Sequence, residues 1–110
     1  MPMNAQYTED EPARESIDQA EGPLVLEFGA SWCGICQAAQ PLINQAFTDF
    51  QEVAHIKVAD GSGRPLGRSF RIKLWPTLIF LRDGKEISRL VRPTQAADIS
   101  KALRQITQTQ

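Results

Sequence analysis

The run at residues 24–28, Leu-Val-Leu-Glu-Phe, constrains the fold of this chain more than any other feature. Apolar residues occupy four of its five positions, and such a run is typical of a strand whose two faces are both covered. A strand of this kind requires helices on both sides of its sheet, which predicts an α/β domain. Because 110 residues are close to the commonest domain size, we expect residues 1–110 to form a single domain.

The other patterns predict that helices and strands alternate along the chain. A capping-box pair, Thr8 and Glu11, predicts a helix that runs to residue 20, and Asp83-Gly84 predicts the turn of a hairpin. Strands separated by helices pair in parallel, whereas a hairpin is antiparallel, so we expect a mixed sheet. The sheet has four strands, or five if residues 3–7 add an edge strand; otherwise residues 1–8 form a flexible tail. The remaining expected elements are helices over 34–50, over 65–70 and from 93 onward, and strands over 53–59, 77–81 and 86–91.

Charge is distributed unevenly between the two halves of the chain. Residues 1–55 carry nine acidic side chains and one basic, whereas residues 56–110 carry four acidic and eleven basic. The basic residues lie scattered among apolar positions, which indicates a solvated surface and not a nucleic-acid site. The sequence has no run of 18 apolar residues and no apolar run after a basic start, so we expect neither a membrane span nor a secretory signal. We therefore expect a cytoplasmic monomer.

The two cysteines, Cys33 and Cys36, are separated by two residues. A disulfide scaffold uses more cysteines, and a closed zinc site uses about four ligands. Beyond the two cysteines the chain offers one histidine, His55, and no further thiol, and we expect that histidine on the surface of a strand. We therefore expect no metal within one chain, although a metal held between two chains stays open. Reversible dithiol chemistry is the remaining mechanism, and it needs no cofactor because the cysteines carry the electrons.

Both cysteines are expected in the first turn of a helix that follows a strand. The unpaired N–H groups there favour a negatively charged thiolate at Cys33. Cys36 lies three residues later on the same helix face, at a separation compatible with a disulfide. This arrangement predicts an exposed attacking thiol at Cys33 and a more buried resolving thiol at Cys36. The alternative is that both are small buried hydrophobic residues.

Residues 30–36, Ala-Ser-Trp-Cys-Gly-Ile-Cys, followed by Pro41, resemble the active-site segment of the thioredoxin family. Residues 75–77, Trp-Pro-Thr, resemble the cis-proline loop of that family. The resemblance covers residues 17–107 in element order and implies the thioredoxin fold, a central mixed sheet flanked by helices. It also implies an enzyme that reduces protein disulfides through a mixed-disulfide intermediate, with an upstream disulfide reductase as electron donor. The alternative is a binding or chaperone-like module of the same fold with regulatory cysteines.

Glu27 is the one charged residue of the buried strand. If it is buried, we expect its pKa to be raised, so that it can exchange protons with Cys36 as a third catalytic group. The alternative is that Glu27 faces solvent. Lys57 matches a lysine that neighbours this carboxylate in the family, or else it is an ordinary strand lysine whose amine reaches the surface.

The remaining candidate residues are expected to bind substrate. They lie in two groups, Trp32, Gly34 and Ile35 beside the cysteines, and Trp75, Pro76 and Arg92 around the proline loop. The resemblance implies that Pro76 is cis and leaves the backbone of Trp75 free to pair with a substrate strand. We expect the two indoles to form a flat apolar rim. Ile35 replaces the family's usual proline, and Arg92 with Lys73 makes the rim basic, which predicts a narrow choice of substrates.

Overall fold

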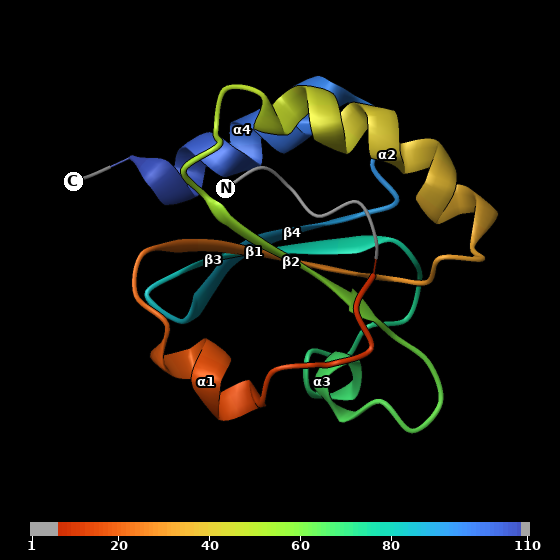
Figure 1. Cartoon of the computed structure of the whole chain (residues 1–110). Helices are drawn as coiled ribbons and strands as arrows, with labels where there is room; N and C mark the ends of the chain where they lie inside the picture. Colours follow the sequence, from red (N-terminus) through yellow and green to blue (C-terminus); the bar gives the residue numbers. More distant parts are fainter. Residues whose placement is uncertain (1–6, 109–110) are drawn as a thin grey trace.

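The computed structural model describes residues 7–108 and contains a four-stranded sheet between two layers of helices (Figure 1). The strand order is β2-β1-β3-β4, with β1–β2 parallel and the other two pairs antiparallel. The predicted element order and the mixed sheet are confirmed. The elements are α1 Arg14–Gln19, β1 Pro23–Gly29, α2 Gly34–Phe47, β2 Ala54–Ala59, α3 Pro65–Ser69, β3 Thr77–Arg82, β4 Lys85–Val91 and α4 Ala96–Thr107.

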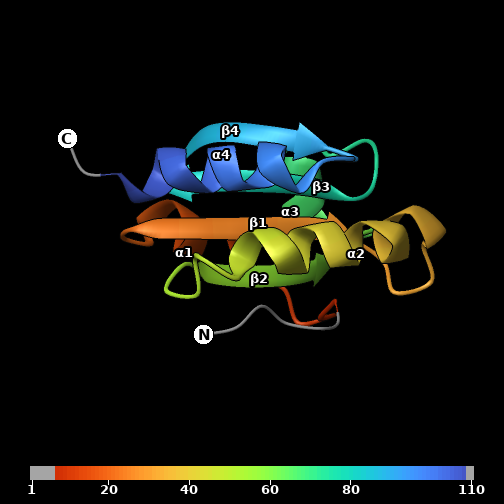
Figure 2. The ribbon, with the colours of Figure 1, turned by 90° about the horizontal axis from the view of Figure 1, so that it is seen from above.

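Strand β1 is central and is covered on both faces, as its apolar run predicts. Leu26 and Phe28 pack in a cluster under α1 and α3, whereas Val25 packs in a second cluster under α2 and α4. Viewed from above, α2 lies over β1 and β2, and α4 lies over β3 and β4 (Figure 2). Because side chains alternate along a strand, Glu27 and Gly29 lie on the same face as Val25, toward α2.

The turn between β3 and β4 has the predicted chemistry. Asp83 and Gly84 have φ angles of 52° and 79°, and two successive positive φ angles are what a two-residue type I′ hairpin requires. The Asp83 carboxylate also accepts a hydrogen bond of 2.8 Å from the backbone N–H of Gly22. The turn is therefore tied to the segment that leads into β1.

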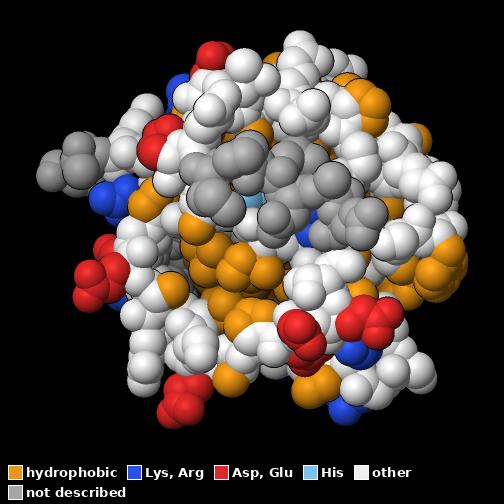
Figure 3. Space-filling model, in the orientation of Figure 1, with side chains coloured by type: hydrophobic (Ala, Val, Ile, Leu, Met, Phe, Trp, Pro, Cys, Tyr) orange, Lys and Arg blue, Asp and Glu red, His pale blue; other side chains and the backbone are white. Residues whose placement is uncertain are grey.

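The possible fifth strand would add residues 3–7 to the edge of the sheet beside β2. Residues 3–6 lie outside the described part of the chain, and Thr8 forms a single parallel bridge with Val58 of β2. Two backbone hydrogen bonds of 2.8 Å, Thr8 N to Lys57 O and Ala59 N to Thr8 O, make this bridge. The bridge therefore holds residue 7 beside β2. On this β2 side of the molecule, apolar side chains gather at the centre of the surface (Figure 3).

Three predicted helix boundaries are wrong. The capping box does not form, because the Thr8 hydroxyl accepts from the N–H of Asp10 and Glu11 accepts from the distant N–H of Leu66. Helix α1 instead begins after Ala13, which has no side-chain cap. Helix α2 ends at Phe47 and is followed by a turn, and α4 begins only after residue 95, whose backbone is extended. No helix among residues 7–108 is long and apolar enough to cross a membrane.

Candidate active site

The two cysteines lie where β1 passes into α2. Cys33 is the N-cap of α2, and its sulfur accepts a hydrogen bond of 3.2 Å from the backbone N–H of Cys36. Both are free thiols; Cys33 is 8% exposed and Cys36 0%. The order of exposure follows the prediction, but Cys33 presents less surface than expected. The N-cap position places this sulfur beside the N–H groups of the first turn of α2.

Gly34 and Ile35 form the exposed first turn of α2 between the cysteines. An added Cβ at Gly34 would meet nothing within 4 Å, and nearly half of the Ile35 side chain is exposed. Neither residue supplies a charge near the cysteine sulfurs. The hydrogen bond that the Cys33 sulfur accepts therefore comes from the backbone of α2.

The loop before β3 contains the predicted cis peptide bond between Trp75 and Pro76. Arg92, with a φ of 52°, closes this loop from the end of β4. Its backbone N–H donates to the carbonyl of Pro76 at 2.9 Å, and its Nε donates to the carbonyl of Trp75 at 2.8 Å. The Trp75 carbonyl therefore already accepts one hydrogen bond from Arg92, and the pairing of the Trp75 backbone with a substrate strand stays a prediction.

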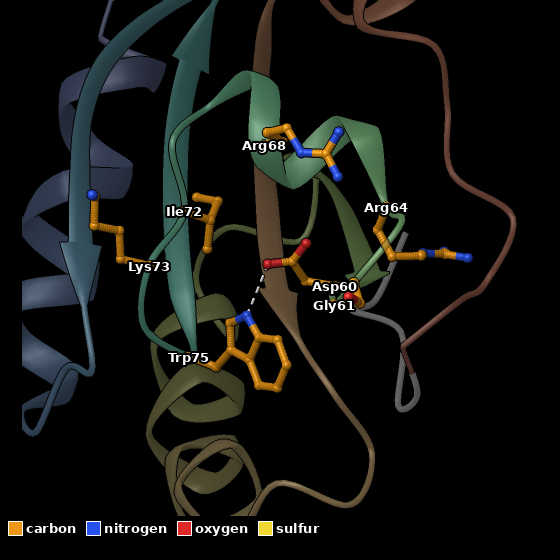
Figure 4. Close-up of a pocket in the computed structure, with 8 residues that line it drawn as sticks. Asp60, Gly61, Arg64, Arg68, Ile72, Lys73 and Trp75 are labelled. Carbon is orange, nitrogen blue, oxygen red and sulfur yellow. Dashed lines mark hydrogen bonds between the residues drawn. The ribbon is translucent and has the colours of Figure 1, made fainter.

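The aromatic rim consists of Trp32 and Trp75, whose ring centroids are 5.5 Å apart. The expected flat rim is wrong, because the rings meet edge to face at 74°. Trp32 is 76% exposed, whereas Trp75 is half-buried and its indole N–H donates to Asp60 at 2.9 Å (Figure 4). Asp60 therefore fixes one ring, against which the exposed ring stands.

A shallow hollow of about 360 Å³ lies beside Trp75 and includes the basic residues Arg64, Arg68 and Lys73. Arg64 and Lys73 point away from one another (Figure 4). Arg64 is also paired with Glu11 at 3.3 Å. Of the two residues expected to make the rim basic, Lys73 lines this hollow and Arg92 does not.

Behind Cys36, Glu27 is completely buried in a cluster of polar side chains. Its Oε1 is 2.9 Å from Nε2 of His55, and its Oε2 accepts hydrogen bonds from Gln40, at 3.0 Å, and from the hydroxyl of Tyr7. The amine of Lys57 lies 3.9 Å from Oε2 of Glu27 and donates to the side-chain oxygen Oε1 of Gln40 at 2.6 Å. Glu27 therefore faces the protein interior and not solvent.

Comparison with known proteins agrees with this arrangement. The family model described as Thioredoxin matches residues 4–105. The chain belongs to the thioredoxin family. It is 36% identical over 73 residues to a thioredoxin of Chlamydia trachomatis, covering 66% of this chain and 71% of that protein. The reduced structure of thioredoxin 2 from Pseudomonas aeruginosa superposes with a TM-score of 0.84 at 52% identity, covering 94% of this chain and 96% of that one.

Two plant relatives are longer than this chain. A rice thioredoxin H2-1 is 34% identical over 68 residues, which cover 62% of this chain and 49% of the relative. A TPR repeat-containing thioredoxin of Arabidopsis thaliana is 33% identical over 84 residues, covering 76% and 22%. The chain thus spans about half or less of the length of these relatives.

The pKa of Glu27 is shifted in the direction opposite to the expected one, because of the residues around it. Burial alone opposes ionisation, but His55, Lys57 and Tyr7 outweigh it and hold the pKa of Glu27 below its ordinary value. Burial lowers the pKa of Lys57, and the charges of Glu27 and Cys36 partly offset that effect. Glu27 is therefore an ionised partner in a buried network, which makes it a weaker proton acceptor than we expect from the sequence.

His55 is not a surface residue as expected. It is 7% exposed, and its ring stacks on Phe47 with centroids 4.4 Å apart and planes at 12°. Lys57 does not reach the surface either, because its side chain is 1% exposed. The signal that could have placed His55 is the period of a strand: residues 55 and 57 share one face of β2, the face toward Glu27.

Tyr7 is the site residue that sequence reasoning missed. It packs against the cluster of Ala30, Cys33 and Cys36, although it lies far from them in the chain. Burial, together with Cys33, raises the pKa of the Cys36 thiol to about 11, and the backbone of Ala30, followed by the hydroxyl of Tyr7, acts in the opposite direction. No motif surrounds Tyr7 in the sequence, so only the tertiary structure places it. Among the described residues, no three His, Cys, Asp or Glu side chains are grouped to hold a metal ion.

Proposed function

We propose that this chain is a thiol–disulfide oxidoreductase that reduces disulfide bonds in protein substrates. The observation that carries the proposal is the N-cap position of Cys33, whose sulfur accepts the N–H of Cys36. A thiolate at a helix N-terminus is a nucleophile, and a second thiol three residues on can complete the exchange. Membership of the thioredoxin family supports the same chemistry.

The reaction proceeds in two exchanges. The Cys33 thiolate attacks one sulfur of the substrate disulfide, whose S–S bond breaks, and the other substrate sulfur leaves and takes a proton. Cys36 then loses its proton and attacks the Cys33 sulfur of the mixed disulfide. The second substrate sulfur leaves as a thiol, and the chain is left with a Cys33–Cys36 disulfide. Two electrons and two protons have passed to the substrate.

The rim would position the substrate. Trp32 and Ile35 offer exposed apolar surface beside Cys33. Trp75, held by Asp60, and Pro76 form the other side, and Arg92 holds the loop that contains them. An apolar segment next to the substrate disulfide fits between these two sides, and Gly34 keeps the approach to Cys33 open.

The oxidised chain needs an electron donor, for which we propose an upstream disulfide reductase. No bound cofactor is needed, because the cysteine pair itself holds the two electrons. We also propose that the protein is a monomer and works in the cytoplasm, where thiols are kept reduced. Light scattering of the purified protein tests the first of these, and cell fractionation with a specific antibody tests the second.

The decisive experiment is reduction of a model protein disulfide with dithiothreitol as electron source. We expect turnover that depends on the chain and is lost in Cys33→Ser. A binding or chaperone-like module would give little turnover and would be unaffected by the substitution. Metal analysis of the same preparation tests a site between two chains, which would contain metal in stoichiometric amount.

A further inference from the structure

Tyr7 occupies space that a side chain at position 29 would otherwise fill. A Cβ added to Gly29 would lie 2.7 Å from the Tyr7 hydroxyl oxygen and 2.8 Å from the sulfur of Cys36. Real Cβ atoms essentially never come so close to another heavy atom. The absence of a side chain at Gly29 therefore lets the tyrosine hydroxyl reach the resolving cysteine.

The Tyr7 hydroxyl has two acceptors and only one proton to donate. One acceptor is Oε2 of Glu27, to which it donates in the dithiol state. The other is the Cys36 sulfur, which lies close enough that a single Cβ at Gly29 would contact both this sulfur and the hydroxyl oxygen. A hydroxyl hydrogen rotates to suit its surroundings, so the tyrosine can change acceptor while its ring stays in place.

Glu27 keeps other partners if Tyr7 turns away. His55 at 2.9 Å and Gln40 at 3.0 Å each hold one carboxylate oxygen. Burial, followed by the charge of Glu27, raises the pKa of Tyr7 far above its ordinary value, so the residue stays a neutral phenol. Tyr7 therefore supplies a hydrogen bond and does not itself ionise.

We propose that Tyr7 is a further catalytic residue, whose hydroxyl turns from Glu27 to donate to the Cys36 sulfur as that sulfur becomes a thiolate and attacks Cys33. The proposal rests on the proposed function, because it concerns the resolving exchange of the same reaction. In that exchange the bond from Cys33 to the substrate breaks and the Cys33–Cys36 bond forms. The proton that Cys36 loses is balanced by the one that the departing substrate thiolate takes up.

The charges around the Cys36 sulfur explain why a donor is needed there. Burial and Cys33 disfavour a negative charge on the Cys36 sulfur, whereas the backbone of Ala30 and the charge of Lys57 favour it. The amine of Lys57 lies 4.5 Å from the centre of the Tyr7 ring. His55 acts one step removed, through Glu27. Among the described residues, a hollow of about 350 Å³ lined by Tyr7, Cys36 and Lys57 adjoins the sulfur, which gives the departing proton a path outward.

The test is Tyr7→Phe, which keeps the ring and removes only the hydroxyl. The reduced protein is mixed with a model protein disulfide, quenched with acid at intervals, and analysed by electrophoresis for the mixed disulfide. We expect the mixed disulfide to decay about 10-fold more slowly, the size expected for loss of one hydrogen bond to a charged group. The slowing should persist across pH 6–9, because the phenol does not titrate there.

The first exchange provides the internal control. In a Cys36→Ser background, Tyr7→Phe should form the mixed disulfide as fast as the background protein, since Cys33 attacks without Tyr7. Thr48→Val, which removes a hydroxyl bonded to Asn44 O in α2 away from the cysteines, should change neither step. Melting temperatures of all variants report on folding.

Two results would overturn the proposal: decay at the wild-type rate in Tyr7→Phe, or equal slowing of both exchanges, which would indicate a purely structural role. Failure of the proposed function looks different. In that case the wild-type protein itself would show no cysteine-dependent reduction of the disulfide.

Discussion

The rim around Cys33 and the cluster behind Cys36 are adjacent but are stabilised in different ways. At the rim, Trp32 is 76% exposed and only Trp75 is held, by Asp60. In the cluster, Glu27 and Lys57 are removed from solvent and their charges are compensated within the protein. Rim residues can therefore change with little effect on stability, whereas each cluster residue is needed to keep the others satisfied.

The difference follows from the cost of burying charge. Removing a neighbour of an exposed indole changes the free energy of unfolding little. Removing the partner of a buried ion lowers the free energy of unfolding by about 3–5 kcal/mol. Substitutions at the rim and in the cluster should therefore have separable effects on activity and on stability.

The cysteines should give the largest effect, and the two should behave differently. Cys33→Ser should abolish disulfide reduction and leave no covalent adduct, because the attacking sulfur is gone. Cys36→Ser should accumulate a stable mixed disulfide with substrate, since nothing remains to release it. Mass spectrometry of the trapped species distinguishes the two outcomes. Equal trapping by both variants would contradict the assigned roles.

Glu27→Gln should destabilise the protein by about 3–5 kcal/mol at neutral pH, because it leaves Lys57 buried without its anionic partner. The pKa of Glu27 is lowered on folding, so its stabilising contribution is present above its ordinary value of 4.5 and is lost as pH falls through the lower folded value. Urea unfolding at pH 7 and pH 3 measures this: the gap between variant and wild type should narrow at the lower pH. Glu21→Gln, at an exposed position, should change stability by less than about 0.5 kcal/mol. A gap that widens in acid would mean that the pKa of Glu27 is raised.

Asp60→Ala should weaken substrate binding and leave stability nearly unchanged. It removes the acceptor of the Trp75 indole N–H, so the ring is no longer fixed beside Trp32. We expect KM for a protein disulfide to rise about 3- to 10-fold, corresponding to one ordinary hydrogen bond, with kcat unchanged. Asp49→Ala, at an exposed position after α2, is the matched control. A fall in kcat without a change in KM would show that Asp60 acts on the chemistry instead.

Ile35→Pro should have the smallest effect, a shift of the redox potential to more negative values by about 10–30 mV. Proline fits the first turn of a helix but removes an N–H that helps the Cys33 thiolate, so the reduced form loses stability. For the wild type we expect about −220 to −270 mV, the range of a reductant. Equilibration with glutathione buffers measures both proteins. A wild-type value above about −180 mV would place the protein among oxidants or isomerases.

Features that depend on neighbouring residues in the chain were predictable from the sequence. The apolar run of β1, the Asp83-Gly84 turn and the cysteine pair each follow from local pattern, and the cis bond at Pro76 follows from the family resemblance. The capping box failed because a distant N–H, that of Leu66, competes for Glu11. Local patterns are reliable only where no distant partner competes.

The buried cluster was not predictable, because its contacts join distant parts of the chain. Tyr7 and His55 reach Glu27 from 20 residues before it and 28 residues after it. Without those contacts, burial is the only influence on Glu27 that the sequence suggests, and burial alone gives the wrong direction for its pKa. The direction of the pKa shift of a buried titratable group can be predicted only when all of its neighbours are known.

The close approach at Gly29 also bears on how related sequences can vary. Positions 7 and 29 compete for one volume beside the Cys36 sulfur, so they cannot change independently. We expect relatives with a large side chain at the position of Gly29 to lack an aromatic residue at the position of Tyr7, and relatives with glycine there to retain one. The evolutionary record of this site should therefore contain two mutually exclusive solutions, connected only by paired substitutions.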